Sequence, residues 1–82
     1  MTETFDSREF LQTWRQRKEK EEWLFAVAIV KVGLEREGNL DEAAEKEITS
    51  ALREFDISEQ ELQEYLQQNR TKLLRFLDSR HA

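Results

Sequence analysis

The sequence predicts an all-α fold, a compact bundle of three to four helices with a central apolar helix. First, the 82-residue chain has no Pro and only two Gly, and it is rich in residues that favour helices. Second, the run WLFAVAIVKVGL at residues 23–34 is apolar on nearly every helical face, which is typical of a helix at the centre of a structure. Third, helix-capping motifs divide the remaining chain into amphipathic segments. This length fits a single helical domain over residues 1–82.

The first helix has a start signal but no clear end. Asp6 is a suitable N-cap, and Glu9 lies three residues later, where it completes a capping box. The following stretch RQRKEKEE, residues 15–22, is polar on all sides and contains no helix-breaking residue. We therefore expect one continuous helix over residues 7–37, with a break near residues 17–21 as the alternative.

The two later helices have stronger local signals. Asn39 or Asp41 caps the next helix, whose apolar residues then recur at helical spacing. Ser58 and Glu61 form a capping box that begins the last helix. The last helix could break at residues 69–71.

The apolar central helix predicts self-association. A chain of this size buries only about 60% of the surface that it exposes when unfolded, so small domains often need additional support. A second copy would cover the faces of residues 23–34 that three short helices leave open, and we expect a homodimer. In the alternative, the single chain covers this helix by itself.

Composition argues against several classes of function. The chain has no Cys, and its one His, His81, is next to the C-terminus. With no phosphate-binding Gly-rich loop either, the sequence predicts no enzyme and no cofactor. The first residues lack the pattern of a signal peptide, and the run at 23–34 is shorter than the ~20 residues that cross a bilayer. The expected location is cytoplasmic, with no membrane partner.

Aromatic residues near the N-terminus indicate a binding surface. Trp14 lies beside the polar stretch at residues 15–22, which offers it no apolar neighbours, and Trp is enriched at the energetic centres of protein interfaces. We therefore predict a small non-enzymatic protein–protein interaction module, acting as an adaptor, regulator or assembly factor. Its predicted partner-binding residues are Phe10, Trp14, Arg17 and Lys18.

A connection between two predicted helices collects acidic side chains. Glu35, Glu37, Asp41 and Glu42 are candidate oxygen ligands for a hard cation. The spacing does not match the calcium loop of an EF-hand, because the required Gly and Glu are missing from the sixth and twelfth positions. Gly38, as a helix end, and Asp41, as a helix start, explain the same residues without a metal.

Three segments of this region carry a resemblance to a known family. They are the apolar run WLFAVAIVKVGL, the connection EREGNLDEAAE and the later FDISEQEL. With these, residues 23–66 resemble the core helical pair of TerB-like domains, a helical family linked to tellurite resistance. The resemblance implies a metal-responsive module whose acidic turn corresponds to Glu37 and Gly38, followed by Asp41 and Glu42. The chain departs from that pattern in having Glu rather than Asp before the Gly.

A second alternative is a nucleic-acid-binding regulator. Residues 51–66, ALREFDISEQELQEYL, have the pattern of a helix-turn-helix element. However, Asp56 occupies the turn position where Gly is usual. The second helix would also bring Glu59, Glu61 and Glu64 toward the phosphates. The sequence therefore argues against nucleic acid as the partner.

Overall fold

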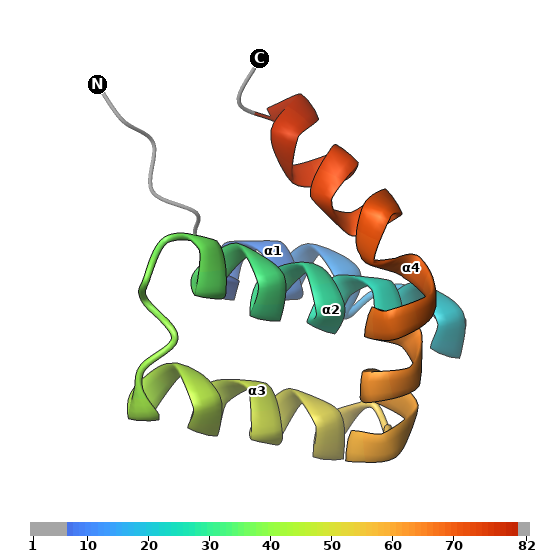
Figure 1. Ribbon diagram of the computed structural model, residues 1–82. Coiled ribbons are helices and arrows are strands. Elements are labelled where there is room, and N and C mark those ends of the chain that lie inside the picture. Colours follow the sequence, from blue (N-terminus) through green and yellow to red (C-terminus); the bar gives the residue numbers. More distant parts are fainter. Residues whose placement is uncertain (1–6, 81–82) are drawn as a thin grey trace.

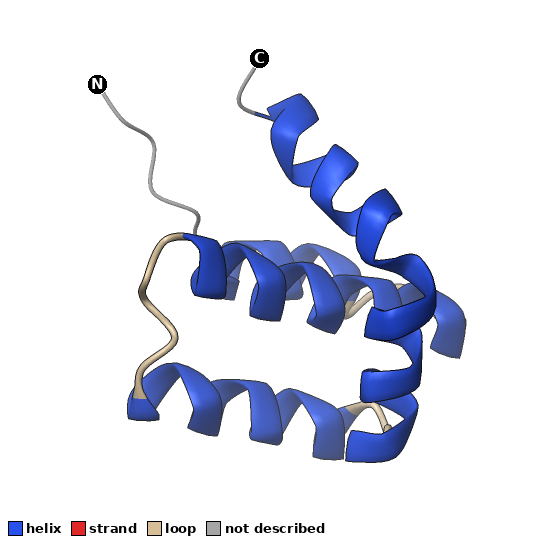
Figure 2. Ribbon diagram, in the orientation of Figure 1, coloured by secondary structure: helices blue, strands red, loops and turns tan. Residues whose placement is uncertain are grey.

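Over the residues that the structure describes, the chain folds into four α-helices. The computed structural model describes residues 7–80, with side chains over residues 10–79, and contains no strand in that range. The helices are α1 (Ser7–Trp14), α2 (Lys20–Arg36), α3 (Glu42–Glu54) and α4 (Glu59–Arg80). Figures 1 and 2 show α2 with α1 beside it, α3 running along its other side and α4 crossing it. The predicted all-α bundle is confirmed, whereas the predicted capping residue Asp6 lies outside the described residues.

The predicted continuous helix over residues 7–37 is wrong. α1 ends at Trp14 and α2 begins at Lys20, so the alternative of a break is correct, although the break covers residues 15–19 and begins two residues before the predicted 17–21. The backbone carbonyl of Trp14 accepts hydrogen bonds from the Arg17 N–H at 3.0 Å and from the Trp23 indole Nε1 at 3.2 Å. The break lets α1 fold back against α2 and bury Leu11, which is 2% exposed. In a straight helix α1 would extend beyond the bundle.

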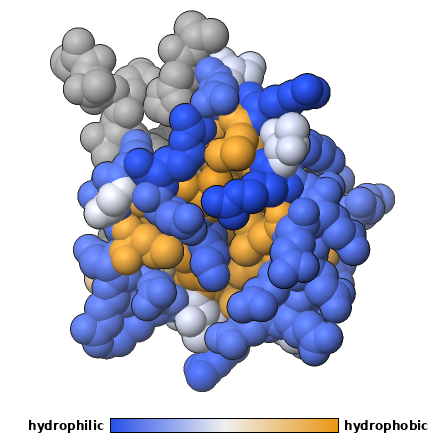
Figure 3. Space-filling model, viewed as in Figure 1, coloured by the Kyte–Doolittle hydropathy of each residue, from blue (hydrophilic) through white to orange (hydrophobic). Residues whose placement is uncertain are grey.

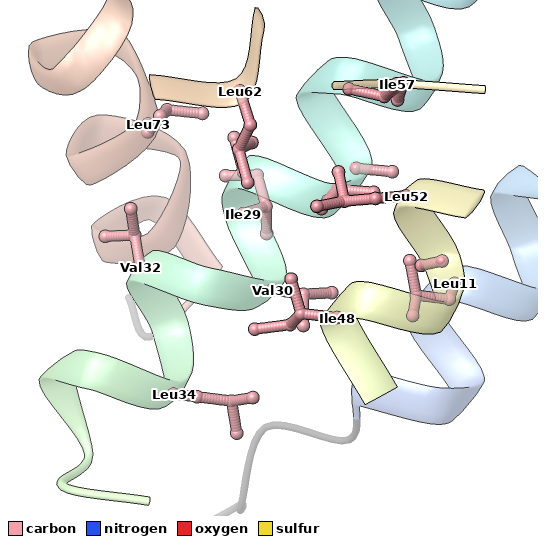
Figure 4. Packing of buried hydrophobic residues seen from close by; sticks show 14 of the residues in the cluster. Leu11, Ile29, Val30, Val32, Leu34, Ile48, Leu52, Ile57, Leu62 and Leu73 are labelled. Atoms are coloured by element: carbon pink, nitrogen blue, oxygen red, sulfur yellow. The ribbon is translucent and has the colours of Figure 1, made fainter. Parts of the chain in front are cut away.

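α2 forms the centre of the core. Ala26–Val30 are almost completely buried, and α1, α3 and α4 all pack against this helix. Figure 4 shows how Ile29 and Val30 of α2 lie among apolar side chains from the other helices. A single chain therefore covers the apolar run, and the reason given above for expecting a second copy no longer applies. None of the helices within residues 7–80 is long and apolar enough to cross a membrane.

The helix ends follow local chemistry. Asp41 accepts a hydrogen bond from the Ala44 N–H at 2.8 Å, and Ser58 and Glu61 exchange the two bonds of a capping box at 3.0 and 3.1 Å. Both predicted caps are confirmed. Gly38 has φ 72° and ends α2, as predicted.

α4 bends at Asn69, within the predicted segment 69–71. The residue has φ −122° and ψ 16°, outside the helical region, and its side-chain amide donates to the Tyr65 carbonyl at 3.0 Å. The bend changes the direction of α4, so that Leu73 and Leu77 on its second half can still reach the core.

Candidate functional site

The structure brings together three of the four predicted partner-binding residues. Phe10 and Trp14 are half-buried on α1, with ring centroids 5.8 Å apart. The exposed Arg17 follows in the turn, and its guanidinium carbon lies 5.4 Å from the centroid of the Trp14 ring. That distance fits a cation–π contact. Lys18 is exposed next to this group.

Two further aromatic rings complete the group. The ring centroid of Phe25 on α2 lies 5.5 Å from that of Trp14 and 5.1 Å from that of Phe76 on α4. The ring centroids of Phe76 and Phe10 are 6.2 Å apart. The four rings, Phe10, Trp14, Phe25 and Phe76, are here called the aromatic cluster. All four are partly exposed. Side chains from three helices therefore form one group of mutually contacting, partly exposed rings.

A pocket of about 280 Å³ opens beside the aromatic cluster. It lies where the turn after α1, the start of α2 and the middle of α4 meet. Its walls combine aromatic, acidic and basic side chains: Trp14, Glu19, Glu21, Glu22, Phe25, Tyr65 and Lys72.

Carboxylates outnumber cations around this pocket. The Oε2 atom of Glu22 is buried and accepts no hydrogen bond within the described residues. It forms an ion pair with Arg17, whose Nε lies 3.6 Å away. Burial raises the pKa of Tyr65, and the negative charge of Glu21 raises it further. The Glu21 carboxylate is therefore close enough to Tyr65 to act on it electrostatically. The Lys72 ammonium lies 5.5 Å from the Phe25 ring centroid. Aromatic rings and an excess of carboxylates therefore line the pocket, and Glu19, Glu21 and Glu22 are here called its acidic rim.

The acidic side chains also have a structural role. Glu21 and Glu22 occupy the first turn of α2, where negative charge offsets the positive end of the helix dipole. Glu19 is the N-cap residue but makes no side-chain capping hydrogen bond. Helix stability therefore accounts for the presence of these charges, while the break after α1 places them around a pocket.

Sequence reasoning missed most of this pocket. Phe25 and Tyr65 fit the apolar patterns of their helices and were indistinguishable from core residues. Lys72 follows the bend at Asn69, which determines the side of the bundle that it faces. A weak signal was present in the three glutamates among residues 19–22, which directly precede Trp23 and Phe25.

The four predicted metal ligands are engaged separately. Glu35 faces Arg70 at 3.8 Å, Glu42 faces Lys46 at 3.8 Å, and Asp41 caps α3. Glu37 ends α2 as its C-cap residue. Over residues 7–80, no three His, Asp or Glu side chains come together as a metal site would require.

The helix-turn-helix-like segment has the predicted turn but an acidic second helix. Asp56 takes the left-handed conformation, with φ 56°, at the position where Gly is usual. Glu59 and Glu64 are exposed on α4, and Glu61 forms an ion pair with Lys20 at 2.9 Å. The carboxylates thus line the surface that would approach phosphates.

Fold and site together define a small all-α domain with a partly exposed aromatic cluster and an acidic-rimmed pocket. Comparison with protein-family models, with curated proteins and with solved structures gives no match. The resemblance to TerB-like domains therefore remains a prediction from the sequence motifs.

Proposed function

We propose that the protein is a small, non-enzymatic protein–protein interaction module that binds its partner through the aromatic cluster and the adjacent pocket. The observation that carries this proposal is the joint exposure of four aromatic rings from three helices. Aromatic side chains bring large apolar area to an interface at a low cost in side-chain entropy, and they are concentrated at interface hot spots.

Packing supports this choice of surface. Partly exposed rings occur singly on most proteins, but contiguous apolar patches on a small domain indicate a contact surface. Figure 3 shows that on the face seen there, apolar surface appears in separate patches between polar side chains. Within the aromatic cluster, each ring contacts another ring, so the shape of the cluster is fixed before a partner arrives.

Self-association can use the same surface. The homodimer predicted from the sequence no longer follows from an uncovered α2, because α2 is buried within one chain. The aromatic cluster is the surface that a second copy would cover. Light scattering across a dilution series tests this: a mass twice that of the 9.9 kDa chain supports the homodimer, and a constant monomer mass rules it out.

A random dodecapeptide library displayed on phage tests the interaction itself. We expect enriched peptides, and we expect Trp14→Ala to weaken binding of the best synthetic peptide at least tenfold, which is about 1.4 kcal/mol. Leu40→Ala is the control, since it also truncates a half-buried apolar residue but lies in the connection between α2 and α3. Circular dichroism checks that both variants fold. Equal binding by the two variants would contradict the proposed surface.

A further inference from the structure

We propose that the pocket beside Trp14 binds a lysine or arginine side chain from a basic segment of the partner. This inference rests on the proposed function and adds the chemistry of the partner to it. The pocket is lined by Trp14, Phe25 and Tyr65, with Glu19, Glu21 and Glu22 also in its walls. Aromatic faces and carboxylates are the two groups that attract an organic cation.

The chain's own cations show that these rings accept positive charge. Arg17 lies over Trp14 at 5.4 Å, and Lys72 lies over Phe25 at 5.5 Å. Both side chains reach their rings from the surface, and Arg17 remains exposed. A partner's cation would therefore meet an environment that already holds guanidinium and ammonium groups in the same way.

The acidic rim has unused capacity for a cation. Among the described side chains, neither Glu19 nor Glu21 forms an ion pair. Glu22 differs from them, because its Oε2 already forms an ion pair with the Arg17 Nε at 3.6 Å. Glu19 and Glu21 can therefore pair with a bound guanidinium or ammonium group, and Glu22 adds to the negative charge around it.

The size of the pocket agrees with a side chain as its occupant. A volume of about 280 Å³ is enough for one long side chain and lies at the small end of the pockets that bind ligands, about 300–1,000 Å³. The partner's remaining residues would then lie over the aromatic cluster, which supplies the apolar contact. A basic amphipathic segment fits both features.

Charge substitutions in the pocket test this inference, because it predicts whether each one weakens or tightens peptide binding. The probe is the best-binding synthetic peptide from the dodecapeptide library. The double substitution Glu21→Gln with Glu22→Gln should weaken its binding about five- to tenfold, because two attractive charges are lost. Lys72→Gln should tighten its binding about two- to fivefold, because a competing cation leaves the pocket.

Matched controls exist on the opposite side of the bundle. The double substitution Glu42→Gln with Glu45→Gln also removes two first-turn carboxylates, one of them paired with a lysine, from a helix start. It changes the net charge equally but lies on α3, away from the pocket. Lys46→Gln is the corresponding control for Lys72→Gln. We expect both controls to bind within about twofold of the wild type.

The outcomes separate this inference from the proposed function. Selected peptides rich in Lys or Arg, with weaker binding after loss of the pocket carboxylates and tighter binding after Lys72→Gln, support it. Peptides without basic residues that still depend on Trp14 would overturn the inference and leave the interaction module intact. Tighter binding after loss of the carboxylates would also overturn it. A library that yields no binding peptide would overturn both.

Discussion

Replacing Trp23 with Phe tests how the break after α1 is held. The Trp23 indole Nε1 donates to the Trp14 carbonyl at 3.2 Å, and the Trp23 ring stacks on Phe55 with centroids 5.0 Å apart and planes 14° apart. Trp23→Phe removes the hydrogen bond but keeps an aromatic ring against Phe55. The variant therefore tests the contact that holds the end of α1 and, with it, the position of Trp14 in the pocket wall.

The magnitude follows from what the carbonyl retains. A hydrogen bond contributes about 0.5–1.5 kcal/mol net to stability, and more when its loss leaves a buried group unsatisfied. The Trp14 carbonyl keeps the Arg17 N–H at 3.0 Å, so the hydrogen-bond loss belongs in the lower half of that range. The smaller ring also buries less apolar surface, at about 25 cal/mol per Å². We expect a total loss of about 1–2 kcal/mol.

Urea unfolding followed by circular dichroism measures this loss, and thermal unfolding should show Tm falling by about 4–8 °C for each kcal/mol. Trp14→Phe is the matched control, because it also replaces an indole by a phenyl ring but removes no hydrogen bond among those of the described residues. It should cost less than Trp23→Phe. Equal losses in the two variants would refute the claim that the indole hydrogen bond holds the turn.

Three further predictions concern the helix ends. Gly38→Ala should lower the free energy of unfolding in urea by about 1–2 kcal/mol, because the residue has φ 72°. An added Cβ would meet no atom within 4 Å, so backbone strain alone should cause the loss, and an unchanged midpoint would contradict this. Asp41→Ala should cost about 1 kcal/mol through loss of the α3 cap, and Asp41→Asn much less. The hydrogen bond from the Ser58 N–H and the contact with Lys20 lower the pKa of Glu61 below its ordinary value of 4.5. The Glu61 carboxylate therefore contributes fully to stability above pH 4.5, and this contribution is lost as the pH falls through the lower pKa of the folded state. Glu61→Gln should therefore flatten the pH dependence of the unfolding midpoint in that acidic range, and an unchanged slope would speak against this linkage.

Local chemistry made most of the fold predictable. The Asp41 cap and the Ser58–Glu61 capping box depend on residues three positions apart, and such short-range patterns are visible in a sequence. The apolar run of α2 identified the core for the same reason. Residues 15–19 were harder, because nothing in them breaks a helix. The hydrogen bond from the Trp23 indole to the Trp14 carbonyl spans this turn and forms only when α1 folds back.

The candidate site was only partly predictable, because it is assembled from three helices. Phe10, Trp14 and Arg17 are close in sequence and were identified together. Phe76 reaches them only through the packing of α4 on α2, and Tyr65 enters the pocket wall by the same packing. A pattern on one helix does not contain these distances. The acidic side chains at the start of α2 likewise became a pocket rim only because the chain turns just before this helix.

The binding role of the aromatic cluster can be tested most directly by nuclear magnetic resonance. The ¹H–¹⁵N spectrum contains one indole signal from each of the two tryptophans, and the Trp23→Phe variant assigns them. Titration with the best library peptide should shift or broaden the Trp14 indole signal most strongly, with smaller changes at Trp23 and none at the Gly38 amide. Changes confined to α3, or an unmoved Trp14 signal in a saturated complex, would contradict the account.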